Sequence, residues 1–293
     1  MIQVPISFDS GVMADWAEVS CLLHRDVSLS RSEVDRVLDQ AAVYSPEATV
    51  GDIWQEISRR HDSGGSSYPV DVENAGLRWP KGWETSPAYT FQLLVACLSH
   101  YPEMRITGAK WNKTSKLFER LTNHAIGRYV GGEAANIGFP REGSMPKSFR
   151  ECLKHISAQM GERRGHPDDV SKDSKDEGVD SIAWRPFLDK RPGQKVILLQ
   201  CAAGSDWKDK AKDVSVDTWK GYVDWAVSPT KGFAFPFVCP DPQEWRRLSK
   251  EGGILLDRLR ITYLFSESPD SMITSQLVQW CKEGLGPFVK MKI

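Results

Sequence analysis

Long hydrophobic runs, paired cysteines and a strong net charge are all missing from this sequence. No apolar run approaches the ~18 residues that would suggest a membrane-spanning helix. The first ten residues, MIQVPISFDS, have neither the basic region nor the apolar core of a signal peptide. The six cysteines are scattered without a Cys-x-x-Cys pair, which argues against disulfide frameworks and zinc ribbons. These absences predict a cytoplasmic protein with reduced thiols and no membrane partner.

Several common functional motifs are also missing. The chain has no Gly-x-x-x-x-Gly-Lys-Ser/Thr segment, which excludes a P-loop nucleotide site. It has no Gly-x-Ser-x-Gly segment, so a hydrolase nucleophile elbow has no support. Neither His155 nor His166 is spaced for zinc with any cysteine. The net charge of −1 means that a nucleic-acid partner would need a local basic patch.

What is present predicts an α/β protein in two regions. Residues 1–112 predict a mostly helical N-terminal module, with Val34, Val37 and Leu38 on one helical face. Ser86-Pro87 is typical of the start of a second, well-buried helix. Residues 113–293 alternate helical and strand patterns, which favours a mixed α/β core with a C-terminal extension. Within that extension the stretch ILLDRLRITYLF alternates enough to predict a strand, with a helix as the alternative.

Two neighbouring predicted strands each carry one polar residue. Asp180 lies with Ile182 and Trp184 on one face of the first strand, and both faces of that strand are apolar. An unpaired buried carboxylate would be costly. Asp180 should therefore be ion-paired, lie at a strand end, or bind a metal. Gln200 follows four aliphatic residues in the second strand, after the turn DKRPGQ.

A hairpin of these strands could bring Asp180 and Gln200 together on one face. Mg²⁺ prefers oxygen ligands such as carboxylates, carbonyls and water. Asp180 could supply a carboxylate, Gln200 an amide oxygen, and Cys201 a backbone carbonyl. The pattern therefore suggests a divalent metal site, with a strand-end ion pair as the alternative for Asp180 alone.

The segments GVDSIAWRPF and VILLQC resemble the core of the PD-(D/E)XK, or restriction-endonuclease-like, nuclease superfamily. Gln200 stands where the Mrr-like branch of this superfamily has a glutamine in its motif, so the sequence resembles that branch. Glu119 in KLFERLTNHAIGRYVGG stands where the superfamily often has an acid on its first core helix. The resemblance covers about residues 115–220. It implies a mixed sheet flanked by helices and an Mg²⁺- or Mn²⁺-dependent DNA endonuclease whose metal ligands are Asp180, Glu119 and the Cys201 carbonyl. By analogy it also implies an effector subunit of a bacterial restriction or anti-phage defence system, with DNA and a protein of that system as partners.

The sequence departs from the superfamily at one position. The lysine expected two residues after Gln200 is Ala202. That lysine orients the attacking water and offsets charge on the phosphate. Lys210, or else Lys208, could reach back from the next predicted helix, although both could be surface lysines.

The departure leaves two alternatives to a nuclease. One is a catalytically inactive nuclease-like fold that binds nucleic acid or a partner. The other is an unrelated α/β protein. Two further alternatives concern single residues. Glu162 is either a solvated helix end or a further ligand, and Arg258 either meets phosphate or pairs with acids.

Overall fold

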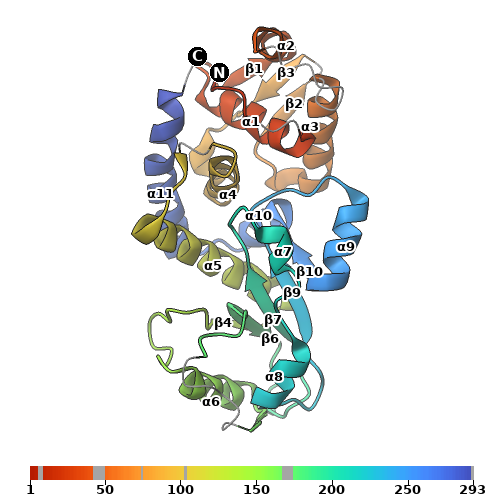
Figure 1. The fold of residues 1–293 in the computed structure, drawn as a ribbon, viewed down its shortest axis with the longest axis vertical. Helices are drawn as coiled ribbons and strands as arrows, with labels where there is room; N and C mark the ends of the chain where they lie inside the picture. Colours follow the sequence, from red (N-terminus) through yellow and green to blue (C-terminus); the bar gives the residue numbers. More distant parts are fainter. Residues whose placement is uncertain (6–8, 42–49, 74, 102–103, 167–173, 292–293) are drawn as a thin grey trace. The chain divides into compact units, whose positions relative to one another are not determined.

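The computed structural model describes residues 1–5, 9–41, 50–73, 75–101, 104–166 and 174–291 (Figure 1). Its internal contacts divide the chain into two compact units. Unit 1 comprises Met1–Thr114, Pro236–Asp241 and Asp257–Ile293, and unit 2 comprises Ser115–Phe235 and Pro242–Leu256. The chain therefore leaves unit 2 and returns to unit 1 twice.

Unit 1 is rich in helices, as the sequence predicts for the N-terminal region. Its strands β1 (Ser28–Ser30), β2 (Asp71–Glu73) and β3 (Gly76–Arg78) form a small antiparallel sheet in the order β1-β3-β2. Every residue of α4 is buried, and this helix packs against α1, α10 and α11. The α-helices of this unit are α1 (Ser10–Leu23), α2 (Arg31–Gln40), α3 (Val50–Gly64), α4 (Pro87–Leu98), α10 (Arg258–Ser266) and α11 (Ser271–Lys290).

One predicted strand divides into a strand and a helix. The stretch ILLDRLRITYLF forms β10 (Ile254–Leu256) and then α10, so its second part takes the helical alternative. Asp257 causes the change, because its carboxylate accepts a hydrogen bond of 3.0 Å from the Arg260 amide and caps the new helix. The sequence predicts that residues 257–293 belong with the rest of residues 113–293. In the structure their contacts place them in unit 1.

A buried ionic network fixes the helices of unit 1. The Arg60 guanidinium binds Asp15 Oδ1 at 2.6 Å and Glu18 Oε1 at 2.9 Å. Arg258 binds both carboxylate oxygens of Asp15 at 2.8 Å, so Arg258 takes the ion-pairing alternative and not contact with phosphate. Three charges of this network therefore come from segments distant in the chain, and each is paired within the fold.

Unit 2 is built on a five-stranded mixed sheet in the order β10-β9-β7-β6-β4. The pairs β4–β6 and β6–β7 are antiparallel, whereas β7–β9 and β9–β10 are parallel. The strands are β4 (Glu133–Asn136), β6 (Ser181–Trp184), β7 (Val196–Cys201), β9 (Thr230–Ala234) and β10. The helices are α5 (Gly108–Val130), which begins in unit 1, and α6 (Phe149–Met160), α7 (Trp207–Lys210), α8 (Val216–Tyr222) and α9 (Pro242–Gly252). A short pair, β5 (Arg163–Arg164) and β8 (Val223–Asp224), completes the unit.

Helices contact both faces of this sheet. Ile182 and Leu198 are cross-strand partners and belong to the core formed with Leu153 of α6 and Trp219 of α8. Because side chains alternate along a strand, the neighbouring residues face the opposite side. There Cys201 Sγ lies 2.9 Å from Thr122 Oγ1 of α5. The mixed α/β core predicted from the sequence is therefore present, with α5 and α6 on opposite faces.

The described part of the chain contains no helix that is both long and apolar enough to cross a membrane.

Candidate active site

Two acids predicted from the sequence meet in unit 2. Glu119 comes from the middle of α5, and Asp180 comes directly before β6. A Cβ atom added to Gly138 would lie 2.8 Å from Asp180 Oδ1 and also 2.8 Å from Glu119 Oε2. These two oxygens are therefore no further apart than twice that distance. Helix α5, the chain after β4 and the start of β6 converge at one point.

The backbone holds Asp180 in place from both neighbouring strands. Its carboxylate Oδ2 accepts a hydrogen bond of 2.7 Å from the Cys201 amide of β7. Its own amide donates to the Leu199 carbonyl, and its carbonyl accepts from the amides of Ile137 and Gly138. This extends the β6–β7 pairing by one residue, so Asp180 is at a strand end, as one of the sequence alternatives required.

Burial and like charge determine the electrostatics of the two acids. Burial raises the pKa of Asp180 well above its usual value, and the neighbouring Glu119 carboxylate raises it further, against the Cys201 hydrogen bond. Burial also raises the pKa of Glu119, although Lys116 opposes that shift. Asp176 adds a third nearby negative charge that raises both values. The pair therefore favours the binding of a cation or the retention of a proton.

Lys116 supplies a cation to this cluster. Its Nζ atom lies 2.6 Å from Glu119 Oε2 and 2.9 Å from the Gly138 carbonyl oxygen. A Cβ atom on Gly138 would lie 3.3 Å from the same nitrogen. Because Lys116 precedes Glu119 by three residues on α5, the two side chains share one helical face. Lys116, Glu119 and Asp180 thus surround the same small space.

Gln200 lies in β7, and in the part of the chain that the structure describes its side-chain hydrogen bond goes to neither of the two acids. Its Nε2 donates to Asp213 Oδ2 at 3.3 Å. Its Oε1 is buried and has no hydrogen-bond partner among the described residues. The residue is 6% exposed, so the orphaned oxygen is shielded from solvent. A buried acceptor without a donor is uncommon, but Gln200 Oε1 is one of ten such atoms among the described residues, so it does not by itself mark a binding site.

Cys201 contributes to the site through its backbone amide and its thiol. The amide binds Asp180, and the thiol contacts Thr122. Burial raises the pKa of the thiol well above its usual value, as does the nearby Asp180 carboxylate, so the thiol stays protonated. Metal ligation by the Cys201 carbonyl stays a prediction.

The two lysines expected to replace the missing motif lysine have other partners. Lys210 Nζ lies 3.5 Å from Asp206 Oδ2, and Lys208 Nζ lies 3.5 Å from Glu244 Oε1. Lys208 also lies over the Trp207 ring, 5.6 Å from its centroid. Helix α7 has only four residues, and Lys208 and Lys210 are its second and last residues. Within the described residues, the structure assigns the cation beside the acids to Lys116.

The residues at this cluster are compatible with a divalent ion. Oxygens of both carboxylates lie too close to Gly138 for a Cβ atom to fit there, so the two acids border the same position. Mg²⁺ is often bound by one or two protein carboxylates, with water and substrate phosphate completing its shell. No group of three or more His, Cys, Asp or Glu side chains in the described ranges could hold a metal alone.

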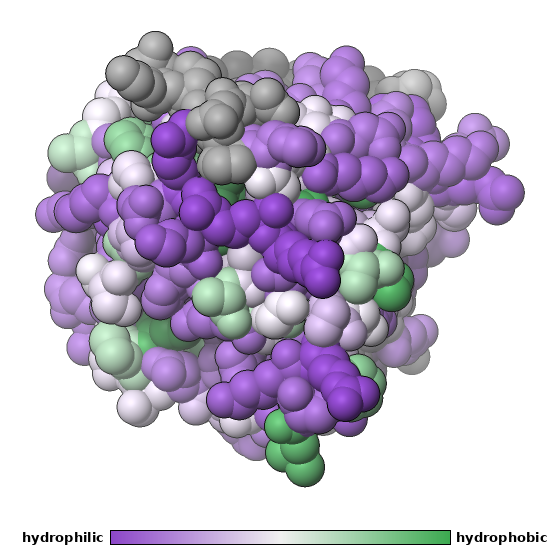
Figure 2. All heavy atoms as spheres, turned by 90° about the horizontal axis from the view of Figure 1, so that it is seen from below, coloured by the Kyte–Doolittle hydropathy of each residue, from purple (hydrophilic) through white to green (hydrophobic). Residues whose placement is uncertain are grey.

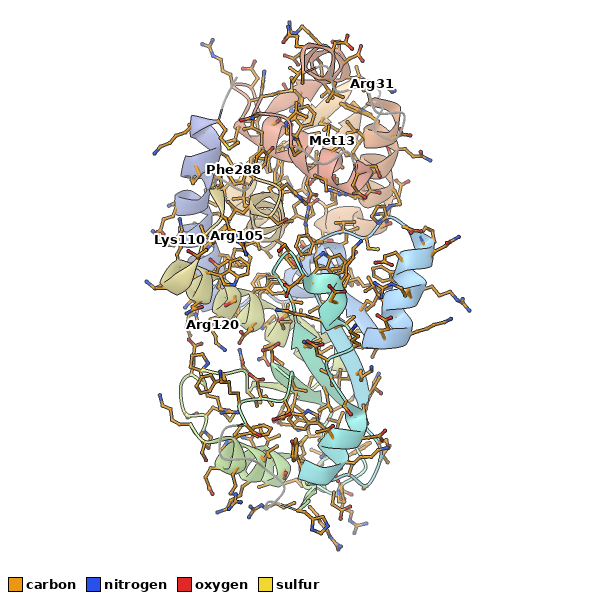
Figure 3. All side chains as sticks on the ribbon, viewed as in Figure 1. Met13, Arg31, Arg105, Lys110, Arg120 and Phe288 are labelled. Atoms are coloured by element: carbon orange, nitrogen blue, oxygen red, sulfur yellow. The ribbon has the colours of Figure 1, made fainter. Side chains whose placement is uncertain are left out.

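Glu162 has a structural position remote from these acids. Its Oε1 accepts from the Gly193 amide at 3.1 Å, and its Oε2 accepts from the Ala226 amide at 3.0 Å. It is buried and binds two loops together, so neither sequence alternative, a solvated helix end or a ligand, describes it. On α5, the half-buried Arg120 (Figure 3) pairs with Glu142, Nη2 to Oε1 at 2.8 Å.

Unit 1 contains a cavity of about 390 Å³. The guanidinium of Arg31 (Figure 3) lies 5.7 Å from the centroid of the Trp54 ring in its wall. Carboxylates of Asp62 and Glu73 line it as well, so no single ligand charge is favoured. None of the site residues predicted from the sequence lines this cavity.

Two members of the site escaped prediction from the sequence. Lys116 was readable only as one of many helix lysines, although its spacing of three residues from Glu119 is the signal that could have identified it. No pattern in the sequence identifies Gly138. It matters because it has no side chain at the point where the Asp180 and Glu119 carboxylates come close to the backbone. Asp173, another acid near Asp180 in the sequence, lies outside the described residues.

Comparisons with protein-family models, with curated proteins and with solved structures found no match to this chain.

Proposed function

We propose that unit 2 is a restriction-endonuclease-like nuclease core that hydrolyses DNA phosphodiester bonds with Mg²⁺ or Mn²⁺. The convergence of Glu119, Asp180 and Lys116 on the space in front of Gly138 carries this proposal. A mixed sheet with helices on both faces supports it, since the resemblance implies that architecture. An effector role in a bacterial defence system rests on the resemblance alone.

Each residue has a distinct task in the proposed reaction. Asp180 and Glu119 would hold the metal, and the Cys201 amide orients the Asp180 carboxylate for it. The bound metal would lower the pKa of a water and stabilise charge on the phosphate. Hydrolysis joins the water oxygen to phosphorus and breaks one phosphorus–oxygen ester bond. Gln200 adds no charge, so metal affinity in the free protein should be weak.

Lys116 would replace the lysine lost at position 202. Its ammonium group is held by Glu119 and by a backbone carbonyl, which fixes it beside the acids before substrate arrives. A fixed cation near the phosphate stabilises the charge that develops in the transition state.

Cleavage of plasmid DNA tests the proposal. Wild-type protein should cleave in Mg²⁺ or Mn²⁺, and Asp180→Asn should abolish cleavage without unfolding the chain, because the amide keeps an oxygen for Cys201. The exposed Glu151→Gln change on α6 is the matched control and should keep full activity. Tight Mg²⁺ binding by the free protein in a titration would contradict the proposed weak site.

Lys116→Met tests the role of the new cation. Loss of one fixed transition-state donor should lower the cleavage rate roughly 100- to 1000-fold. Lys210→Met is the matched control, since Lys210 pairs with Asp206 at the surface, and it should cleave at the wild-type rate. If Lys210→Met lowered the cleavage rate and Lys116→Met did not, Lys210 would be the cation that stabilises the transition state.

A second candidate function is a binding subunit without catalysis. Ala202 and the tight Lys116–Glu119 pair favour it, because an internal cation already neutralises one of the two acids. DNA binding by folded wild-type protein, with no cleavage in either metal, would select this function over the nuclease.

A further inference from the structure

The loop between β6 and β7 exposes two large apolar side chains side by side. Phe187 is 63% exposed and Leu188 is fully exposed. The face in Figure 2 is mostly hydrophilic, with hydrophobic side chains in small separate groups. We call residues 185–195 the hairpin loop. Adjacent exposed Phe and Leu are unfavourable in water unless a partner covers them.

The backbone of the hairpin loop is held in a defined conformation. The Arg185 amide donates to the Lys195 carbonyl at 3.2 Å, and the Lys190 amide donates to the Phe187 carbonyl at 3.1 Å. The Gly193 amide is held by the buried Glu162 carboxylate. Gly193 has a φ of 92°, in the left-handed region that glycine adopts without steric cost. The loop therefore presents Phe187 and Leu188 on a fixed support.

The loop also carries a strong local positive charge. It contains four cations, Arg185, Lys190, Arg191 and Lys195, and one acid, Asp189. All five are exposed. Among the described residues, the contact from Arg191 Nε to Asp189 Oδ2, at 3.8 Å, is the one ion pair that involves these cations.

A second exposed aromatic residue lies beside this loop. Lys195 Nζ lies 5.2 Å from the centroid of the ring of Tyr129, which is 45% exposed. Arg128, next to Tyr129 in α5, is exposed as well and adds to the positive charge. The exposed surface that combines apolar and basic side chains therefore extends from the hairpin loop to the end of α5.

We infer that the hairpin loop is a DNA-binding wedge. Proteins that bend DNA insert apolar side chains such as Phe and Leu between base pairs, while nearby cations bind the phosphates. A protein partner would also cover Phe187 and Leu188, but four cations around them favour a polyanion. The loop joins β6 to β7 at the ends away from Asp180 and Gln200. Strands of this length span roughly 15–20 Å, so a duplex along them would reach both loop and acids.

This inference rests on the proposed function, so the test separates binding from cleavage. Binding of a fluorescent 30-base-pair duplex is measured in EDTA, where no metal-dependent cleavage occurs, and end-to-end energy transfer reports bending. The double variant Phe187→Ser/Leu188→Ser should weaken binding at least 10-fold and remove the bend. Its melting temperature should equal that of wild type, because both side chains are exposed.

Two control variants separate the wedge from general surface effects. Met272→Ser/Val289→Ser removes comparably exposed apolar side chains from unit 1 and should bind as wild type does. Lys190→Gln/Arg191→Gln should reduce the slope of log K against log salt by about 0.9 for each lost phosphate contact. Wild-type affinity and bending in the double serine variant would overturn the wedge and point to a protein partner, whatever the cleavage result. Bound and bent DNA that is never cleaved would reject the nuclease and keep the wedge.

Discussion

Gly138 shows how one missing side chain can shape a site. Asp180 Oδ1, Glu119 Oε2 and Lys116 Nζ all border the position that a Cβ atom would take. Two buried carboxylates side by side are costly unless a cation shares the space. The two carboxylates therefore favour a nearby cation, and the three side chains of Asp180, Glu119 and Lys116 depend on one another.

Gly138→Ala is expected to disable this group without unfolding unit 2. The new methyl would lie 2.8 Å from both carboxylate oxygens and must displace them. Displacement of catalytic groups by about 1 Å can cost roughly 100-fold in rate, so Mg²⁺-dependent cleavage should fall by about that factor. Gly221→Ala is the control, since a Cβ atom there has no neighbour within 4 Å. Equal cleavage rates for the two variants would remove Gly138 from the site.

The paired strands β6 and β7 position the acids at the level of elements. Ile182 and Leu198 bury one face of this pair against α6, whereas the Asp180 carboxylate approaches Glu119 of α5, although strict alternation would put Asp180 on the face of Ile182. A slip of one residue would turn every paired side chain to the other face, so this packing fixes the register of β6 and β7 and with it the Cys201 amide that binds the Asp180 carboxylate. The geometry of the site therefore depends on core contacts remote from it.

Leu153→Ala on α6 tests this dependence. The side chain is 5% exposed within the core of unit 2, and its truncation should lower the free energy of unfolding by roughly 2–5 kcal/mol. Amide hydrogen exchange of β6 and β7 should accelerate, as their packing loosens. Lys154→Ala, at the next and exposed position, should change the free energy by no more than about 0.5 kcal/mol. Unchanged exchange in the Leu153 variant would show that the strand pair is stable without α6.

At the scale of the whole molecule, the chain leaves unit 1 and closes on it again. Asp15 in α1 and Arg258 in α10 form a fully buried pair although they are 243 positions apart. Residues 257–293 thereby join the unit in which the chain begins, and unit 2 is inserted between these segments. Stability of unit 1 therefore requires the ionised form of Asp15.

Acid should weaken this closure. Burial raises the pKa of Asp15, but Arg258 and Arg60 outweigh it and bring the pKa to about 2, below the usual 3.8. The stabilisation is complete above pH 3.8 and is lost as the pH falls through about 2. Asp15→Asn should thus cost roughly 3–5 kcal/mol at pH 7, because two buried guanidinium groups lose their partner. In thermal unfolding, the difference in melting temperature between Asp15→Asn and wild type should become smaller toward pH 2. A difference that does not depend on pH would show that the ionised form of Asp15 does not stabilise unit 1.

The sequence by itself determined the helix-rich start and the mixed α/β core, and it gave a strand end as one of three alternatives for Asp180. These follow from local patterns, since the spacing of apolar residues is set by the helical and strand repeats. The cap at Asp257 was also local, yet the strand-like alternation around it obscured the helix.

Only the tertiary structure decided which cation lies beside Glu119 and Asp180, why Gly138 is small, and which unit contains residues 257–293. Each of these depends on the approach of segments far apart in the chain. Lys116 and Lys210 are both lysines on predicted helices, and only packing shows which one is beside the acids. Patterns along a sequence describe the faces of an element, whereas the packing of elements determines which faces meet.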